Sequence, residues 1–249
     1  MKFENTQIWG FEHAMRGMRN PMNSWDKSDS YYGYTLEAVG DGSHQPTRIL
    51  YIIGENDMKL AQKLIRAGSE HRKFMRQIFV SVDITAPLYW WKEFDTYKVG
   101  TVTNSTSTMH KIASTPITLE CFEIDDHKRE FVTYSAPFGD SYNNVEQFLI
   151  PFLEGLRQKY FETKDKVYWK ELIRWLPESW LQKRTVTMNY ENLLAICSKG
   201  QRRFHKLNEW SGIDDPTVPN FISWARTLRY AQELIFLDEL DKEIKTVEE

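Results

Sequence analysis

The stretch from Lys170 to His205 constrains the fold most, because it joins a charged helical pattern to an apolar one across a proline. Glu171 and Arg174 stand three positions apart, so on a helix their side chains share one face. Pro177 ends that helix, since proline lacks the amide hydrogen and clashes with the preceding turn. Apolar residues return after this break, and their spacing predicts a second helix from about Asn189 onward.

A cationic group closes this second helix, with Arg202, Arg203 and His205 in sequence. Arginines hold phosphates well, because a guanidinium donates charge-assisted and often bidentate hydrogen bonds. Arg174 and the Arg202/Arg203 cluster are therefore candidates for binding an anion. The ordinary alternative is a surface ion pair and a cationic helix end. Spacing alone favours that alternative.

The composition limits the classes of protein to which the chain can belong. With 249 residues it is long enough for a substantial core, in one large domain or two small ones. A net charge of −3 argues against a general nucleic-acid binder, which would carry a basic surplus. Nine Trp, twelve Tyr and fourteen Phe can fill cores and subunit interfaces, or stack on planar ligands.

Cysteine usage and hydropathy predict the environment of the protein. Cys121 and Cys197 form neither a C-x-x-C motif nor a disulfide framework, which is typical of a reducing compartment. No apolar run approaches the roughly 20 residues that a membrane helix needs, and the N-terminus is too polar for a signal peptide. We therefore expect a cytoplasmic protein without a membrane partner.

Both strand and helix patterns occur along the chain. The expected strands lie at residues 1–12, 48–53, 79–84 and 117–124. The expected helices lie after Gly54 up to Gly68, at 70–78, 88–100, 145–161, around Glu171, from Asn189 and at 221–240. Loops are expected at 16–30 and 101–111.

Several common catalytic and binding motifs do not occur in the sequence. A G-x-S-x-G nucleophile elbow, a phosphate-binding P-loop and a G-x-G-x-x-G dinucleotide fingerprint are all missing. The six histidines never form H-x-x-x-H or H-E-x-x-H, so no metal site is predicted. The remaining chemical groups are cations and hydroxyls, which suit a phosphorylated planar ligand.

These residues resemble those of a known family. Glu171 and Arg174, followed by Leu176-Pro177 and then by Thr187 and Asn189 at the start of a helix, resemble the C-terminal part of the flavin-dependent thymidylate synthases. Upstream, Glu70-His71, then Ala86-Pro87 before an aromatic helix and a Ser-rich segment, are similar to that family's flavin and nucleotide region. The resemblance covers roughly residues 70–110 and 165–215.

The sequence departs from the family at its signature motif. The family has Arg-His-Arg, where this chain has Thr96-Tyr97-Lys98. Lys98 stands for one arginine, and Ser107 matches the second serine of the motif if one residue is inserted. Met109 falls where the family has an arginine. These departures leave room for a changed substrate or one-carbon donor.

The resemblance implies a fold and a reaction. The implied fold is an α/β fold of the α+β type, with a mixed sheet and long packed helices, forming a single domain over residues 1–249 with additions at 1–69 and 112–142. The implied reaction is the reductive methylation of dUMP to dTMP, with FAD as cofactor and with NADPH and methylenetetrahydrofolate as co-substrates. Family members are homotetramers with sites between subunits, and no protein cysteine attacks the pyrimidine.

The resemblance also implies roles for individual residues. Glu171, Arg174 and Ser107 form the implied catalytic group, in which Ser107 contacts the nucleotide phosphate and Glu171 orients nucleotide and flavin. Arg174 and one arginine of the pair Arg202 and Arg203 bind the nucleotide. The residues that face the flavin are His71, Lys98 and Asn189.

Two other hypotheses remain open. One is a catalytically silent relative that binds a nucleotide, or assembles as a structural oligomer, without flavin. The other is that the similarity is accidental and Glu171 with Arg174 is an ordinary ion pair. Flavin retention separates the enzyme from the silent relative, and alanine substitution of Arg174 tests the accidental similarity.

Overall fold

The computed structural model describes residues 1–38, 44–124, 134–135, 141–142, 145–198 and 201–248. The chain divides into two compact units. Unit 1 consists of Met1–Lys2, Asp83–Thr96 and Thr103–Thr185, and unit 2 of Phe3–Val82, Tyr97–Val102 and Val186–Glu249. The single domain over residues 1–249, with additions at 1–69 and 112–142, stays a prediction.

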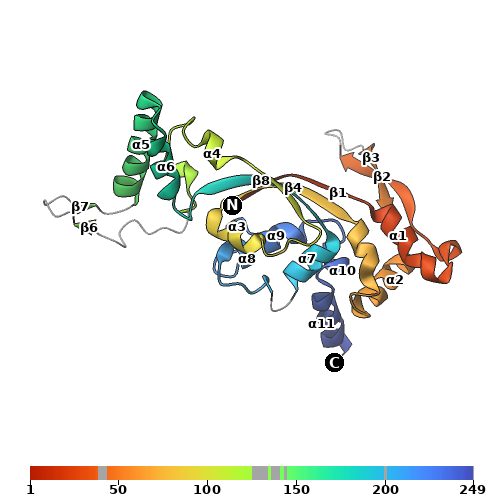
Figure 1. Ribbon diagram of the computed structural model, residues 1–249. Coiled ribbons are helices and arrows are strands. Elements are labelled where there is room, and N and C mark those ends of the chain that lie inside the picture. Colours follow the sequence, from red (N-terminus) through yellow and green to blue (C-terminus); the bar gives the residue numbers. More distant parts are fainter. Residues whose placement is uncertain (39–43, 125–133, 136–140, 143–144, 199–200, 249) are drawn as a thin grey trace. The chain divides into compact units, whose positions relative to one another are not determined.

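A four-stranded sheet has the strand order β1-β4-β8-β5 (Figure 1). In β4, Val80, Val82 and Ile84 are buried and alternate with less buried neighbours, as the two-residue period of a strand requires. With the helices, this sheet confirms the predicted α/β fold class. The four strands are β1 (Lys2–Trp9), β4 (Phe79–Pro87), β8 (Leu181–Asn189) and β5 (Val102–Ser105).

Unit 2 contains most of the short helices and a β-hairpin. Its α-helices are α1 (Phe11–Arg19), α2 (Glu55–Arg66), α7 (Tyr190–Cys197), α8 (Asn208–Ser211), α9 (Phe221–Arg226), α10 (Ala231–Leu234) and α11 (Leu237–Glu248). Its 3-10 helices are η1 (Asn20–Met22), η2 (Trp25–Lys27) and η3 (Arg72–Gln77), and its hairpin strands are β2 (Tyr31–Ala38) and β3 (His44–Ile52).

The loop expected at residues 16–30 begins instead with the second half of helix α1. The buried positions of this helix follow an i, i+3, i+4, i+7 stripe, at Phe11, Ala14, Met15 and Met18. Arg19 is also buried, because its guanidinium bonds the Asp57 carboxylate of α2. The loop prediction was wrong for residues 16–19, since the charged positions concealed the apolar stripe.

The single helix expected over residues 221–240 is divided into α9, α10 and the start of α11. Tyr230 interrupts it with a φ of 57°, in the left-handed region that a helix interior excludes. The Tyr230 hydroxyl accepts a hydrogen bond from the Ile53 amide at 3.0 Å. This long-range contact holds the break in place and could not be foreseen from helical spacing.

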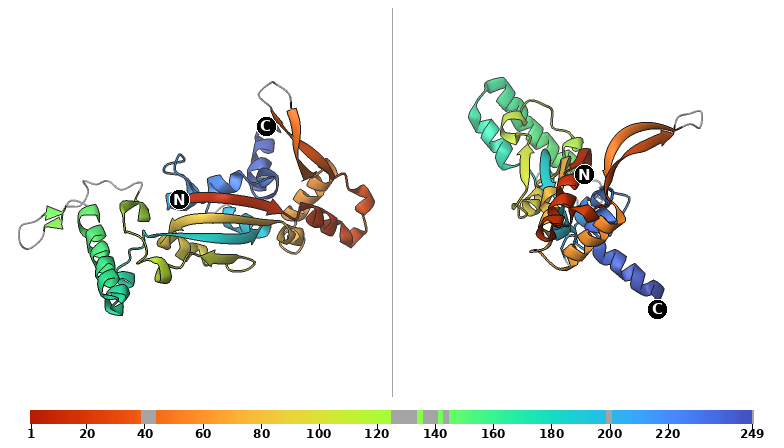
Figure 2. Two further views of the ribbon diagram at one scale, coloured as in Figure 1. Left: turned by 90° about the horizontal axis from the view of Figure 1, so that it is seen from above. Right: turned by 90° about the vertical axis from the view of Figure 1, so that its right-hand side faces the viewer.

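Strands β2 and β3 pair antiparallel, with Tyr31 opposite Ile52 and an irregularity between Thr35 and Leu36. Figure 2 shows them as a twisted two-stranded ribbon. The strand expected at residues 48–53 is therefore confirmed over most of its length. Helix α2 follows, and its first amides are capped by the carboxylate of Asp29, which accepts from Asn56 and Asp57.

Unit 1 places helices α5 (Val145–Thr163) and α6 (Lys166–Arg174) side by side (Figure 1). A buried apolar cluster of this unit consists of Ile112, Ile117, Phe122, Leu153 and Leu172. The remaining elements of the unit are α3 (Leu88–Phe94), α4 (Thr108–Lys111), η4 (Leu119–Cys121), β6 (Tyr134–Ser135) and β7 (Ser141–Tyr142).

The strand expected at residues 117–124 does not form. Leu119–Cys121 adopts a 3-10 turn, and only Phe122 makes an isolated antiparallel bridge, to Trp180. The side chains of Ile117 and Phe122 enter the core from this irregular segment. The apolar pattern therefore reported burial correctly but not the backbone conformation. Within the described residues, no helix is long and apolar enough to cross a membrane.

Glu154 on α5 ties this irregular segment to the helix pair. Arg157 donates to its carboxylate at 2.6 and 2.7 Å, and the Ile117 amide donates at 2.9 Å. These hydrogen bonds, that from Arg157 foremost, lower the pKa of Glu154 to about 2. A depressed pKa means that the stabilisation is present above the unfolded pKa near 4.5 and is lost as the pH falls from there toward 2.

We expect Glu154→Gln to reduce the free energy of unfolding at pH 7 by about 1 to 3 kcal/mol, the range for hydrogen bonds to charged groups. The difference from the wild type should shrink as the pH falls below 4.5. Urea unfolding at several pH values measures it. Glu162→Gln is the matched control on the same helix, because Glu162 forms an exposed pair with Lys159. Equal losses in both variants would contradict this role for Glu154.

Candidate functional site

Glu171 and Arg174 form the predicted pair on helix α6 of unit 1. Asp165 caps the helix by accepting the Val167 amide, and the fully buried Leu172 faces the core. Arg174 donates to the Glu171 carboxylate, and the Trp175 indole N–H donates to its second oxygen at 3.0 Å. These two hydrogen bonds hold the pKa of Glu171 below its usual range.

The Arg174 side chain remains 55% exposed, so its guanidinium lies at the surface of unit 1. Trp175 is exposed as well, and its ring contacts Phe152 of α5 edge-on. The arrangement offers a cation beside aromatic side chains. It suits an anionic planar ligand, and it also agrees with the ordinary interpretation of an exposed ion pair.

Ser107 precedes the short helix α4 in the same unit. Its hydroxyl accepts the His110 amide at 3.2 Å and lies 2.6 Å from His110 Nδ1. Helix α4 is fixed to α6, because the Trp169 indole N–H donates to the Met109 carbonyl at 2.9 Å. Ser107 is thus carried on an element bonded to the helix of Glu171 and Arg174.

Asn189 caps helix α7 of unit 2. Its carboxamide oxygen accepts the Asn192 amide, while the Asn192 side chain accepts the Asn189 amide, which is a reciprocal capping box. Asn192 also donates to the Val99 carbonyl at 2.6 Å. The segment that carries Lys98 is thereby held at the beginning of α7.

Arg202 and Arg203 have different surroundings although they are neighbours. Arg202 donates to the Tyr97 hydroxyl at 3.0 Å and lies over the Tyr97 and Trp210 rings. Arg203 is 5% exposed and bonds the Asp238 carboxylate at 2.8 and 2.9 Å. These bonds lower the pKa of Asp238 and fasten α11. Arg202 therefore contacts Tyr97, the residue before Lys98, and Arg203 has a stabilising position.

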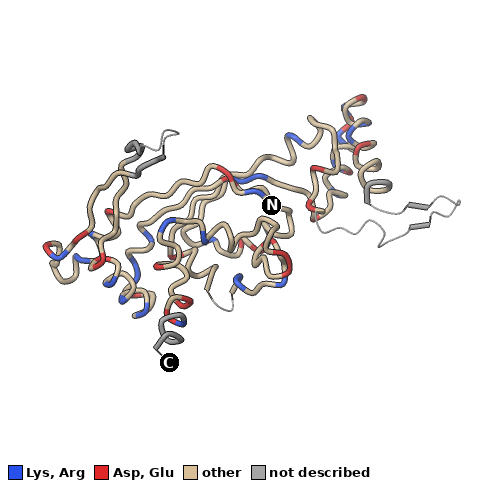
Figure 3. The backbone as a smooth tube through the Cα atoms, turned by 180° about the vertical axis from the view of Figure 1, so that it is seen from behind, with Lys and Arg blue, Asp and Glu red and all other residues tan. Residues whose placement is uncertain are grey.

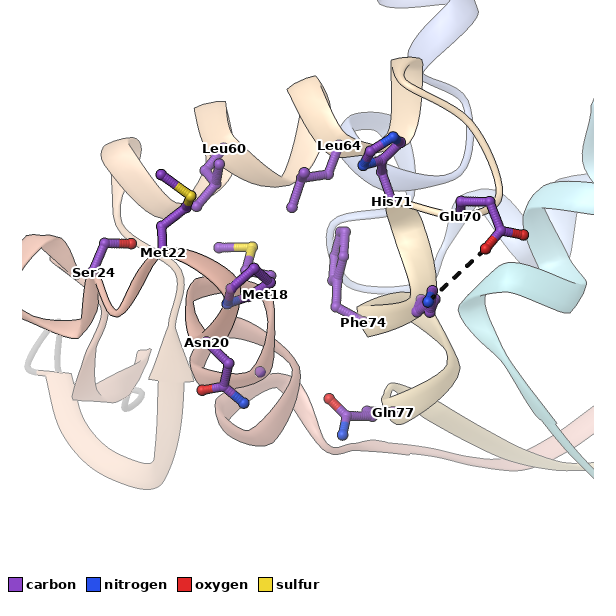
Figure 4. A pocket seen from close by; sticks show the side chains of 13 residues that line it. Met18, Asn20, Met22, Ser24, Leu60, Leu64, Glu70, His71, Phe74 and Gln77 are labelled. Carbon is purple, nitrogen blue, oxygen red and sulfur yellow. Dashed lines mark ion pairs between the residues drawn. The ribbon is translucent and has the colours of Figure 1, made fainter.

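His71 lines a cavity of about 560 Å³ in unit 2, between α1, α2 and η3. Figure 4 shows the apolar part of its wall, formed by Met18, Leu60, Leu64 and Phe74. The sequence pattern indicated His71 but not this cavity, because its walls come from separate helices. Lys73 also lines the cavity and forms an ion pair with Glu70.

Helix α7 connects the candidate residues of unit 2. Its Glu191 accepts hydrogen bonds from Arg72 and Arg76 of η3, which follows His71 directly. Its N-terminus holds Asn189 and the Lys98 segment. Figure 3 shows Lys and Arg along α1, α2 and η3, and several of these cations are paired with carboxylates.

Comparisons with known proteins give a clear result for structure alone. No protein-family model matches the chain, and no curated protein matches its sequence. A crystal structure of the flavin-dependent thymidylate synthase ThyX from Helicobacter pylori, complexed with FAD and dUMP, matches with a TM-score of 0.60 at 15% identity. The match covers 96% of this chain and 99% of that chain.

A second structure of the Helicobacter pylori enzyme with FAD and dUMP matches with a TM-score of 0.57 at 14% identity, over 96% and 98% of the two chains. The chain therefore has the fold of flavin-dependent thymidylate synthase. A UMP/dUMP methylase, PolB from Streptomyces cacaoi, bound with 5-Br dUMP, also matches, with a TM-score of 0.52 at 13% identity over 95% and 94% of the chains.

The likeness to the thymidylate synthase fold extends well beyond residues 70–110 and 165–215, on which the sequence resemblance rests. At 13 to 15% identity, most positions differ while the backbone arrangement persists. A likeness of this kind establishes a fold and not a reaction. The reaction of this chain therefore depends on its own side chains.

The two cysteines of the chain, Cys121 and Cys197, are both free thiols. Cys197 is fully buried, and burial raises the pKa of its thiol to about 12, which makes it an inert core residue. No group of three or more His, Cys, Asp or Glu side chains in the described ranges is placed to hold a metal ion.

Gly100 allows the Lys98 segment to approach α7. It has a φ of +75°, and a Cβ at this position would lie 2.9 Å from Asn189 Nδ2 and 3.1 Å from Asn192 Oδ1. We expect Gly100→Ala to reduce the free energy of unfolding by about 2 kcal/mol, of which about 1 comes from the strained backbone. Chemical denaturation measures this loss.

Gly68→Ala is the matched control for Gly100→Ala. Gly68 also has a positive φ, +104°, but a Cβ there would meet nothing within 4 Å. Only the backbone strain is then introduced, so Gly68→Ala should cost less. An equal or larger loss at Gly68 would show that contact with the Asn189 cap is unimportant.

Proposed function

We propose that the protein is an enzyme that methylates a pyrimidine deoxynucleotide in the manner of dUMP conversion to dTMP. FAD is the proposed cofactor, NADPH the hydride source and methylenetetrahydrofolate the carbon donor. One observation carries this proposal: the fold likeness extends over nearly the whole chain to proteins solved with FAD and dUMP or with 5-Br dUMP. The site residues are assigned from the sequence resemblance and from their chemistry.

In unit 1, Arg174 is the proposed ligand of the nucleotide phosphate. Its exposed guanidinium is oriented by Glu171, which in turn is held by the Trp175 indole. The hydroxyl of Ser107 is a second proposed phosphate ligand. Of the two candidate arginines in unit 2, we assign nucleotide binding to Arg202, because the Arg203 guanidinium is buried against Asp238.

In unit 2, Lys98, Asn189 and His71 are the proposed flavin-binding residues. Their chemistry fits FAD, because a cation suits its pyrophosphate and amide and imidazole groups can bond its ring system. The close approach of Gly100 to the Asn189 amide supports this fit, since a larger residue would displace the segment that carries Lys98. When bound, FAD supplies hydride transfer. The task of the protein side chains is to bind and orient.

The exchange of Arg-His-Arg for Thr96-Tyr97-Lys98 favours a second candidate function. A relative that binds a nucleotide without flavin would retain Arg174 and need no cation at position 98. Assembly into a homotetramer with sites between subunits belongs to the first proposal, and light scattering of the purified protein measures it.

The decisive assay supplies dUMP, methylenetetrahydrofolate, NADPH and FAD together and follows the nucleotide by mass spectrometry. The proposal predicts a product one methylene unit heavier than dUMP, formed only when all components are present. Binding of dUMP without any product, under conditions in which the Helicobacter pylori enzyme is active, would favour the nucleotide-binding relative.

A further inference from the structure

Ser107 and His110 form a close pair on the α4 segment of unit 1. The Ser107 oxygen accepts the His110 amide at 3.2 Å, and it also lies 2.6 Å from His110 Nδ1. Both side chains are exposed. The pair therefore faces solvent, with its hydrogen-bonding groups accessible to a ligand.

The position of the hydroxyl proton decides what Ser107 offers to that ligand. A serine oxygen has one hydrogen to donate and two lone pairs that accept. If the proton points at His110 Nδ1, Ser107 presents only a lone pair outward, which repels a phosphate oxygen. If His110 instead donates from Nδ1, both lone pairs of Ser107 are occupied, and its hydrogen is left to donate to an anion.

The frame that carries this pair is fixed by neighbouring side chains. The Trp169 indole of α6 holds the Met109 carbonyl at 2.9 Å, and Gln182 Nε2 donates to the Thr106 carbonyl at 3.1 Å. Two contacts thus fasten the backbone on either side of Ser107. On this fixed backbone, the Ser107 oxygen accepts the His110 amide and lies 2.6 Å from His110 Nδ1, so the direction of the hydroxyl proton depends on whether Nδ1 donates or accepts.

We infer that His110 is a positioning residue that donates to Ser107 from Nδ1 and so directs the Ser107 hydroxyl proton at the phosphate of the bound nucleotide. This inference rests on the proposed function and adds to it a residue that the sequence resemblance does not assign. It also fits the local sequence, in which Met109 replaces a cation of the family motif. Here an imidazole on the next residue supplies the donor.

The test compares His110→Leu with His110→Asn in the full-length protein. Leucine removes the donor, whereas the asparagine Nδ2 group stands close to the position of the histidine Nδ1 and can donate to Ser107. We expect His110→Leu to weaken dUMP binding about five- to tenfold, as the loss of one hydrogen bond does, and His110→Asn to restore it to within about twofold. Deoxyuridine, which has no phosphate, should bind all three proteins alike.

A double-mutant cycle completes the test. In a Ser107→Ala background, His110→Leu should have no further effect on dUMP binding, because the inference routes its action through the hydroxyl. Equal dUMP affinity of the wild type and His110→Leu would overturn the inference while leaving the proposed function intact. So would additive effects in the cycle, or equal losses for dUMP and deoxyuridine. If the wild type binds no dUMP, both this inference and the proposed function are wrong.

Discussion

Replacing Arg174 with alanine should lower the affinity for dUMP by about 30- to 150-fold and reduce the rate of methylation at low dUMP accordingly. The physical reason is the loss of a charge-assisted phosphate contact, worth about 2 to 3 kcal/mol. Stability should change little, because the pair with Glu171 is exposed at the end of α6. Isothermal calorimetry with dUMP and urea unfolding measure the two quantities.

Lys159→Ala is the matched control for Arg174→Ala. Lys159 is an exposed cation of unit 1 that pairs three positions along its helix, with Glu162. Lys159→Ala removes one positive charge, as Arg174→Ala does, but should leave the affinity for dUMP unaltered. If Arg174→Ala loses stability but keeps its dUMP affinity, Glu171 and Arg174 form only an ordinary ion pair, and the resemblance at this position is accidental.

The largest effect on stability is expected at Asp57. This carboxylate is fully buried and accepts from Arg19 at 2.5 Å, Ser28 at 2.6 Å and Ser30 at 2.5 Å. Asp57→Ala would leave the buried Arg19 charge without its partner, which typically costs 3 to 5 kcal/mol. Urea unfolding should therefore show a greatly lowered midpoint.

Glu55→Ala on the same helix is the control for Asp57→Ala. Glu55 pairs with Lys59, and both side chains are more than two-thirds exposed, so less than about 1 kcal/mol should be lost. A second variant, Asp57→Leu with Arg19→Met, removes both buried charges and should recover part of the stability. If Asp57→Ala is as stable as Glu55→Ala, the buried network does not stabilise unit 2.

Local signals predicted those parts of the fold and the candidate site that depend on neighbours in sequence. The spacing of Glu171 and Arg174 indicated a shared helix face, and the structure joins them on α6. The helix expected from Asn189 begins there, because its cap is closed by Asn192 three residues later. The alternation in residues 79–84 likewise gave strand β4.

Long-range partners determine the features that sequence patterns could not reveal. Arg202 and Arg203 are the same residue type at adjacent positions, but Arg202 bonds Tyr97 whereas Arg203 bonds Asp238. The burial of Arg19 depends on Asp57, 38 residues away. The break at Tyr230 depends on Ile53, from the other end of the chain. The spacing of apolar residues along the sequence reveals none of these long-range contacts.

The site residues that sequence reasoning missed are of the same kind. Asn192 supports the Lys98 segment through the Val99 carbonyl, and Trp175 supports Glu171 through its indole. A signal existed for Trp175, since it stands four positions after Glu171 on the same helical face. No sequence signal indicated the hydrogen bond from Asn192 to Val99, because it joins residues 93 positions apart.

The most direct test of the central claim is the visible absorption spectrum of the purified protein titrated with FAD, before and after addition of dUMP. We expect that FAD is retained after gel filtration, that its absorption band shifts when dUMP is added, and that Lys98→Ala weakens retention. If saturating FAD leaves the protein colourless after gel filtration, with or without dUMP, the fold does not serve flavin-dependent methylation in this chain.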